Sequence, residues 1–168
     1  GKTTSDTEHL SIELASQMFL VSTRAKTLDE ARALCRSMLD SGKAYEKFEQ
    51  MVHAQGGNIH QPLPKAKVVR ELRAARSGVL RFLNVESVGL GCIILGAGRR
   101  KSSDDIDPAA GIEIFAKAGQ GVDCGDIILK SYASDAKKID EAEVFFNGSF
   151  DISENPHSPT PLIAKVLL

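Results

Sequence analysis

The strongest constraint on the fold is a strand, a helix and a loop that follow one another in residues 77–107. Residues 77–83 have the apolar alternation of a strand. Asn84 follows and can cap a helix predicted over residues 84–95. A glycine-rich, basic loop comes next, with the sequence Gly96-Ala97-Gly98-Arg99-Arg100-Lys101. This order indicates a domain that mixes helices with strands.

The remaining C-terminal residues continue the same alternation. Ser134 is predicted to cap a second helix, which ends near Phe146. A turn is predicted at residues 117–121. Further strands are predicted at residues 67–73, 112–116, 127–133, 150–152 and 162–167. We therefore expect residues 66–168 to form one β-rich unit with both helices packed on it, so the fold class is α+β.

The first 57 residues have apolar residues at helical rather than strand spacing, and they are predicted to form three helices. Thr27 begins a capping box that is completed by Glu30. Two apolar stripes follow helical spacing, Leu10-Leu14-Met18 and Leu34-Cys35-Met38. Fifty-seven residues lie near the lower size limit for an independent core. Since the chain also starts without methionine, we expect a fragment or processed product whose stripes pack on protein outside it.

Composition narrows the classes of partner. The net charge of −1 gives no electrostatic basis for a nucleic-acid or membrane partner. Cys35, Cys92 and Cys124 are far apart and form no zinc-binding pair, and no metal site is predicted.

Residues 58–65 contain two prolines and are predicted to form a linker. No signal peptide is recognised, and the composition fits the cytoplasm.

Two features of the 77–107 segment carry further expectations. Gly89 and Gly91 lower the helix propensity, so we expect close helix packing at both. The loop cations Arg99 and Arg100 are expected to form ion pairs with nearby aspartates, namely Asp104, Asp105 and Asp107. Direct phosphate binding by this loop is disfavoured, because the loop follows a helix whereas phosphate loops normally precede one.

Three blocks of sequence resemble the pyrimidine-nucleoside phosphorylases, the family that includes thymidine phosphorylase. One is residues 78–107. A second is Leu-Asp-Ser-Gly-Lys-Ala-Tyr-Glu-Lys-Phe-Glu-Gln-Met-Val-His-Ala-Gln-Gly-Gly at residues 39–57. The third, residues 107–133, contains Asp-Pro-Ala-Ala-Gly-Ile and Lys-Ala-Gly-Gln-Gly-Val. The resemblance implies that residues 66–168 are the family's C-terminal α/β-hammerhead domain and that residues 1–57 belong to its larger α/β domain.

The resemblance also implies a function. The parent enzyme would cleave thymidine or uridine with inorganic phosphate as co-substrate, without a cofactor, and would be a homodimer. The family's phosphate and pyrimidine ligands precede the segment represented here, so no catalytic or substrate-binding residue is assigned in this chain. Its role would be structural, with a candidate cleft-closing loop formed by Gly96, Gly98, Arg99 and Arg100. The alternative is a biotinyl- or lipoyl-type carrier module, which would need an exposed lysine at the tip of the 117–121 hairpin.

Overall fold

The computed structural model describes residues 5–154 and 161–165. The described residues divide into two compact units, one of residues 5–61 and 161–165 and the other of residues 62–154. The first unit contains three helices, and the second contains all the strands of the described residues together with two helices. Each unit is described by itself.

The helical unit consists of α1 (Ser5–Val21), α2 (Leu28–Asp40) and α3 (Lys43–Ala54). Helix α1 packs on α2, and α2 makes fewer contacts with α3. Thr27 caps α2, since its hydroxyl accepts a hydrogen bond from Glu30 N at 3.2 Å. The Glu30 carboxylate in turn accepts from Lys26 N at 2.8 Å, one residue earlier than a standard capping box requires.

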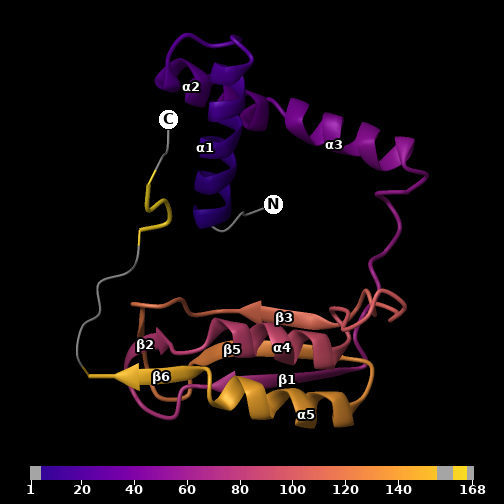
Figure 1. The fold of residues 1–168 in the computed structure, drawn as a ribbon, viewed down its shortest axis with the longest axis vertical. Coiled ribbons are helices and arrows are strands. Elements are labelled where there is room, and N and C mark those ends of the chain that lie inside the picture. The colour runs from indigo at the N-terminus through magenta and orange to yellow at the C-terminus, as the bar shows by residue number, and fades with distance from the viewer. Residues whose placement is uncertain (1–4, 155–160, 166–168) are drawn as a thin grey trace. The chain divides into compact units, whose positions relative to one another are not determined.

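The second unit, which we call the β unit, contains two three-stranded antiparallel sheets (Figure 1). Sheet A has the order β1-β5-β3, formed by Val68–Arg73, Ile127–Ala133 and Gly111–Ile114. Sheet B has the order β4-β2-β6, formed by Gly121–Val122, Gly78–Phe82 and Phe150–Ser153. Helices α4 (Val85–Leu95) and α5 (Ala136–Asn147) pack against each other and on sheet A. The charged strand β1 is an edge strand, where charges discourage pairing with other chains.

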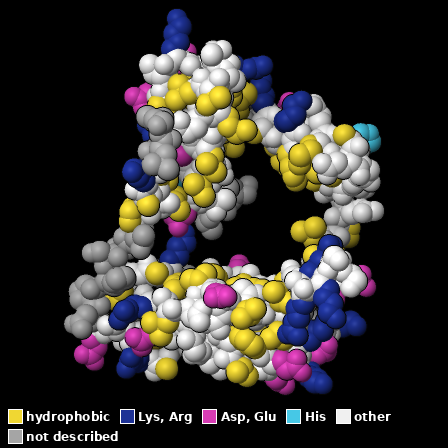
Figure 2. All heavy atoms as spheres, in the orientation of Figure 1, with side chains coloured by type: hydrophobic (Ala, Val, Ile, Leu, Met, Phe, Trp, Pro, Cys, Tyr) yellow, Lys and Arg dark blue, Asp and Glu magenta, His cyan; other side chains and the backbone are white. Residues whose placement is uncertain are grey.

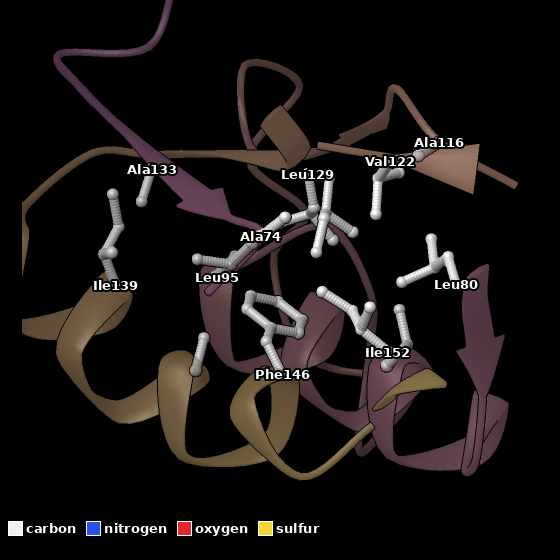
Figure 3. Packing of buried hydrophobic residues seen from close by; sticks show 13 residues of the cluster. Ala74, Leu80, Leu95, Ala116, Val122, Leu129, Ala133, Ile139, Phe146 and Ile152 are labelled. Atoms are coloured by element: carbon white, nitrogen blue, oxygen red, sulfur yellow. The ribbon is translucent and has the colours of Figure 1, made fainter. Parts of the chain in front are cut away.

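The core of the β unit lies between the helices and the two sheets (Figure 3). Its largest fully buried side chain is Phe146, which points from α5 toward α4. A Cβ atom placed on Gly91 would lie 2.3 Å from Phe146 Cε1, so only glycine allows this close approach of the helices. Gly89 differs, because a Cβ there would meet nothing within 4 Å. The packing prediction is therefore confirmed for Gly91 and wrong for Gly89.

The structure confirms the α+β class and changes three details of the prediction. The cap of α5 is Asp135 rather than Ser134, and its carboxylate accepts a hydrogen bond from Lys138 N at 3.0 Å. Ser134 directly follows β5, so the helix begins one residue later than predicted. The described residues 161–165 contain no strand, and the end of the predicted 162–167 strand lies outside the described residues. The predicted turn leads into β4, which pairs with β2.

Candidate functional site: the loop between α4 and β3

The loop of residues 96–110, which we call the α4–β3 loop, begins at the C-terminal end of α4. Gly96 has φ of +106°, a left-handed conformation that glycine adopts without steric cost. Its N–H donates to Ile93 O at 3.1 Å, and Ala97 N donates to Cys92 O at 3.0 Å. These bonds satisfy carbonyl groups that the helix end would otherwise leave unpaired. The loop therefore starts from a fixed position on α4.

Two aspartates hold the rest of the loop through its backbone. One oxygen of Asp104 accepts hydrogen bonds from Arg100 N at 3.0 Å and from Lys101 N at 2.9 Å. Asp107 N donates to Gly96 O at 2.9 Å, and the Asp107 carboxylate accepts from Ala109 N at 2.9 Å. The predicted ion pairs between these carboxylates and Arg99 or Arg100 are wrong for the described residues, because Asp104 and Asp107 bind main-chain N–H groups instead.

The cationic side chains of the loop point into solvent. Arg99, Arg100 and Lys101 are exposed, and none of them forms an ion pair with another described residue through its charged group. A fourth cation, Lys138 of α5, lies beside the start of the loop, since its Nζ is 3.4 Å from the point where a Cβ on Gly96 would lie. Lys and Arg side chains gather at the end of the β unit where this loop lies (Figure 2). We call these four residues the basic corner.

The basic corner could attract an anion but is poorly built to cradle phosphate. Phosphate loops bind largely through free backbone N–H groups at a helix N-terminus. Here Gly96 and Ala97 donate to carbonyls of α4, and Arg100 and Lys101 donate to Asp104. The negative end of the α4 dipole also faces the loop, which favours the cations and not an anion. The geometry thus adds a second reason to disfavour direct phosphate binding.

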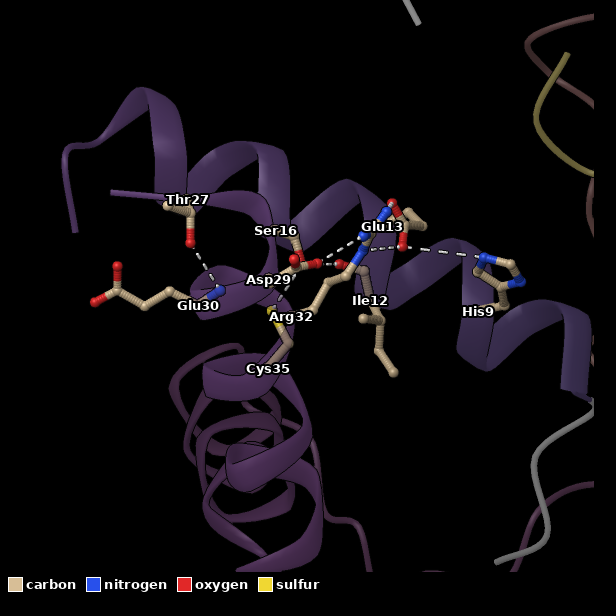
Figure 4. A network of polar contacts seen from close by, with 9 residues as sticks. All are labelled: His9, Ile12, Glu13, Ser16, Thr27, Asp29, Glu30, Arg32 and Cys35. Carbon is tan, nitrogen blue, oxygen red and sulfur yellow. Dashed lines mark hydrogen bonds and ion pairs between the residues drawn. The ribbon is translucent and has the colours of Figure 1, made fainter. Parts of the chain in front are cut away.

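The helical unit holds a second polar cluster, between α1 and α2 (Figure 4). Arg32 Nε donates to Glu13 Oε1 at 2.6 Å, and Arg32 Nη2 donates to Glu13 Oε2 at 2.8 Å. The hydrogen bonds from Arg32 hold the pKa of the Glu13 carboxyl below its usual value, against the opposing effect of burial. His9 Nε2 lies 4.0 Å from the same carboxylate. A bidentate pair linking two helices is most simply structural.

A partly apolar pocket in the β unit also lacks a catalytic arrangement. It has a volume of about 300 Å³ and is lined by Leu72, Phe150 and Ile152, with Arg76 and Asp151 among its polar groups. Arg76 Nη2 is already bonded to Asp151 Oδ1 at 3.2 Å and to the carbonyl of Ile152. No nucleophile or histidine lines this pocket.

No three histidine, cysteine or carboxylate side chains gather as ligands for a metal ion in the described part of the chain. No helix among these residues is both long and apolar enough to cross a membrane. All three cysteines are free, with Cys35 buried and Cys124 exposed. Burial raises the pKa of the Cys92 thiol. Lys117, in the turn that the carrier alternative requires, is not free of interactions.

Sequence reasoning missed two features of this site, the position of Lys138 and the partners of Asp104. Lys138 lies in the first turn of α5, and nothing in the local sequence places it at the end of α4. Asp104 was recognised as a loop residue, but its partners were expected to be guanidinium groups. A spacing of three to four residues between Asp104 and the two N–H groups is the signal that could have indicated a side chain to backbone bond.

Comparison with known proteins gives a consistent result. Residues 79–153 match the family model of the pyrimidine nucleoside phosphorylase C-terminal domain. The chain is 37% identical over 172 residues to the pyrimidine-nucleoside phosphorylase of Staphylococcus aureus strain bovine RF122 / ET3-1, covering 99% of this chain and 39% of that protein. It is 36% identical over 173 residues to the protein of the same name from strain MSSA476, covering 100% of this chain and 40% of the relative. The chain thus spans about two fifths of the length of these relatives.

Proposed function

We propose that this chain is the C-terminal part of a pyrimidine-nucleoside phosphorylase, as its similarity to that family indicates. Such an enzyme uses inorganic phosphate to cleave the N-glycosidic bond of a pyrimidine nucleoside, and it releases the base and a pentose 1-phosphate. The observation that carries the proposal is the 37% identity that extends over 99% of this chain.

The reaction places clear demands on the enzyme. A phosphate oxygen must lie under C1′ of an oxocarbenium-like sugar while charge on the departing base is stabilised. The cleft must also open for substrate and close to exclude water. We assign the phosphate and pyrimidine ligands to the part of the enzyme that precedes this chain. The α4–β3 loop, with Gly96, Gly98, Arg99 and Arg100, would close against that part.

The helical unit fits a role as one section of a larger domain. Leu14, Met18 and Val21 on α1 have exposed fractions of 59%, 73% and 87%. Contiguous exposed apolar residues usually mark an interface. We propose that residues 1–57 pack on the preceding α/β domain, that residues 58–65 are a linker, and that residues 66–168 form an α/β-hammerhead domain.

The remaining assignments follow from the proposed enzyme. We expect a homodimer located in the cytoplasm, with thymidine or uridine as substrate and inorganic phosphate as the only co-substrate. The three cysteines are free thiols, which fits a reducing compartment. The carrier alternative has no specific observation in its favour.

A direct assay tests the proposal. The full-length protein containing this chain is incubated with thymidine or uridine, with and without inorganic phosphate, and the free base is quantified by chromatography. We expect phosphate-dependent base release by the full-length protein and none above background by the 168-residue chain. Release by the short chain, abolished by a substitution within it, would contradict the structural role. No release by the full-length protein would refute the proposed function.

A further inference from the structure

The α4–β3 loop contains an internal support that leaves its cations available. The Asp104 side chain is partly buried, and one of its oxygens binds the N–H groups of Arg100 and Lys101. The backbone N–H of Asp104 donates back to Lys101 O at 3.1 Å. Three hydrogen bonds therefore fix residues 100–104, and two of them are charge-assisted, which makes them stronger than neutral ones.

This support has an electrostatic consequence. The carboxylate closest in sequence to Arg100 and Lys101 is occupied by backbone N–H groups, so it does not form an ion pair with their charged groups. Arg99, Arg100 and Lys101 then have no paired carboxylate among the described residues, and neither has Lys138, whose ammonium group lies beside Gly96 at the start of the loop. The negative end of the α4 dipole offsets part of their mutual repulsion. The guanidinium groups keep their full set of donors for a partner outside this unit.

We propose that Asp104 is a positioning residue that presents Arg99 and Arg100 to carboxylate groups on the substrate-binding part of the same enzyme, where the ion pairs hold the closed cleft. This inference rests on the proposed function. A carboxylate partner is favoured over phosphate because the loop N–H groups that would cradle phosphate are already used. An arginine fork matches a carboxylate in a bidentate geometry and needs no backbone help.

The test uses three variants of the full-length enzyme. Asp104→Ala removes the support, while Asp104→Asn keeps an oxygen that can accept both N–H groups. Asp105→Ala is the matched control, because Asp105 is an exposed neighbour of the same charge that bonds to no other described residue. We expect Asp104→Ala to lower kcat/KM about five- to tenfold, Asp104→Asn by less than about twofold, and Asp105→Ala to leave it unchanged.

A salt series identifies the partner. The screening length falls from about 30 Å at 0.01 M ionic strength to about 3 Å at 1 M, so ion pairs that close the cleft weaken over this range. We expect kcat/KM for both substrates to fall with salt in the wild type and to lose most of that dependence in the double variant Arg99→Gln/Arg100→Gln. A rise in the KM for phosphate alone, with the KM for nucleoside and kcat unchanged, would instead show that the loop binds the co-substrate and would overturn the proposal.

Amide exchange separates failure of this inference from failure of the proposed function. We expect Asp104→Ala to speed exchange at the Arg100 and Lys101 amides in the full-length protein, and high salt to speed exchange across residues 96–104 in the wild type. These readouts do not depend on activity. If the wild-type enzyme shows no phosphorolysis, the function is wrong and the exchange data still decide on the loop. If Asp104→Ala behaves as Asp105→Ala in exchange and in kinetics, Asp104 does not position the loop.

Discussion

The two units of this chain use similar amphipathic patterns but bury apolar side chains to very different degrees. In the β unit, large residues such as Phe146, Leu80 and Leu95 are almost fully buried in one continuous cluster. In the described part of the helical unit, the buried apolar residues are mostly small: Ile12, Ala25, Ala31 and Cys35. The larger side chains of that unit remain exposed, including Leu14, Met18, Val21, Tyr45, Phe48 and Met51.

The difference shows what periodicity does and does not determine. An apolar stripe makes a helix amphipathic, but a second layer must cover the stripe before it becomes a core. In the β unit, α4, α5 and two sheets provide those layers. In the helical unit, α1 packs on α2, but Leu14, Met18 and Val21 of α1 stay exposed. We therefore expect the two units to differ in stability, and the following predictions test this.

The largest expected effect comes from removing a side chain at the centre of the β unit. Phe146→Ala should destabilise that unit by about 3–5 kcal/mol, as for other buried aromatic residues. The matched substitution Leu14→Ala, at an exposed position of α1, should change the stability of the isolated chain by less than about 0.5 kcal/mol. Amide exchange during denaturant unfolding reports on each unit separately. Equal costs for the two substitutions would refute the contrast.

Limited proteolysis of the 168-residue chain provides the next test. Regions with few buried apolar contacts open with a low free energy and are cleaved first. We expect cleavage within residues 5–57 to be about a hundredfold faster than within residues 66–154, which corresponds to about 2.8 kcal/mol in opening free energy. Mass spectrometry of the fragments locates the sites. If a strictly monomeric sample resists cleavage equally in both ranges, the helical unit is self-sufficient and its exposed stripes are not an interface.

Two glycines on α4 give a sharper test within the β unit. Gly91→Ala would place a methyl group 2.3 Å from the Phe146 ring, and we expect a loss of about 1–3 kcal/mol from overpacking. Gly89→Ala meets open space and should stabilise the chain by about 0.5–1 kcal/mol through helix propensity. Thermal unfolding of both variants measures the difference. Stabilisation by Gly91→Ala would show that α4 and α5 are farther apart than described.

These glycines also show where sequence reasoning stopped. The strand and helix order of residues 66–154 was largely predictable, because turns, caps and alternation are local signals. Which of two glycines faces a neighbouring helix depends on α5, some fifty residues later in the chain. The same limit explains the candidate site. The cations of the α4–β3 loop could be recognised in sequence, but the proximity of Lys138 and the role of Asp104 depend on tertiary structure.

The smallest expected effect is a pH dependence that distinguishes the two units. Glu13 in the helical unit and Glu71 in the β unit both have a pKa below the usual value, because Arg32 bonds to the first and Lys130 to the second. A carboxyl whose pKa is lower in the folded state stabilises that state above its unfolded pKa of 4.5. This contribution is lost as the pH falls through the folded value.

Loss of an ion pair at low pH should destabilise a contact between two elements more when few other interactions hold those elements together. The Glu71–Lys130 pair joins β1 to β5, which are already connected along a six-residue ladder. The Glu13–Arg32 pair joins α1 to α2, where little else is buried. We therefore expect amide exchange in α1 and α2 to accelerate between pH 5 and pH 3 before exchange in β1 and β5 does. Glu13→Gln should weaken the α1–α2 contact at pH 7 and flatten this dependence, because an amide does not titrate. The control is Glu46→Gln on the exposed surface of α3, which should leave the pH dependence unchanged. An equal effect of both substitutions would show that the pH dependence does not come from the α1–α2 ion pair.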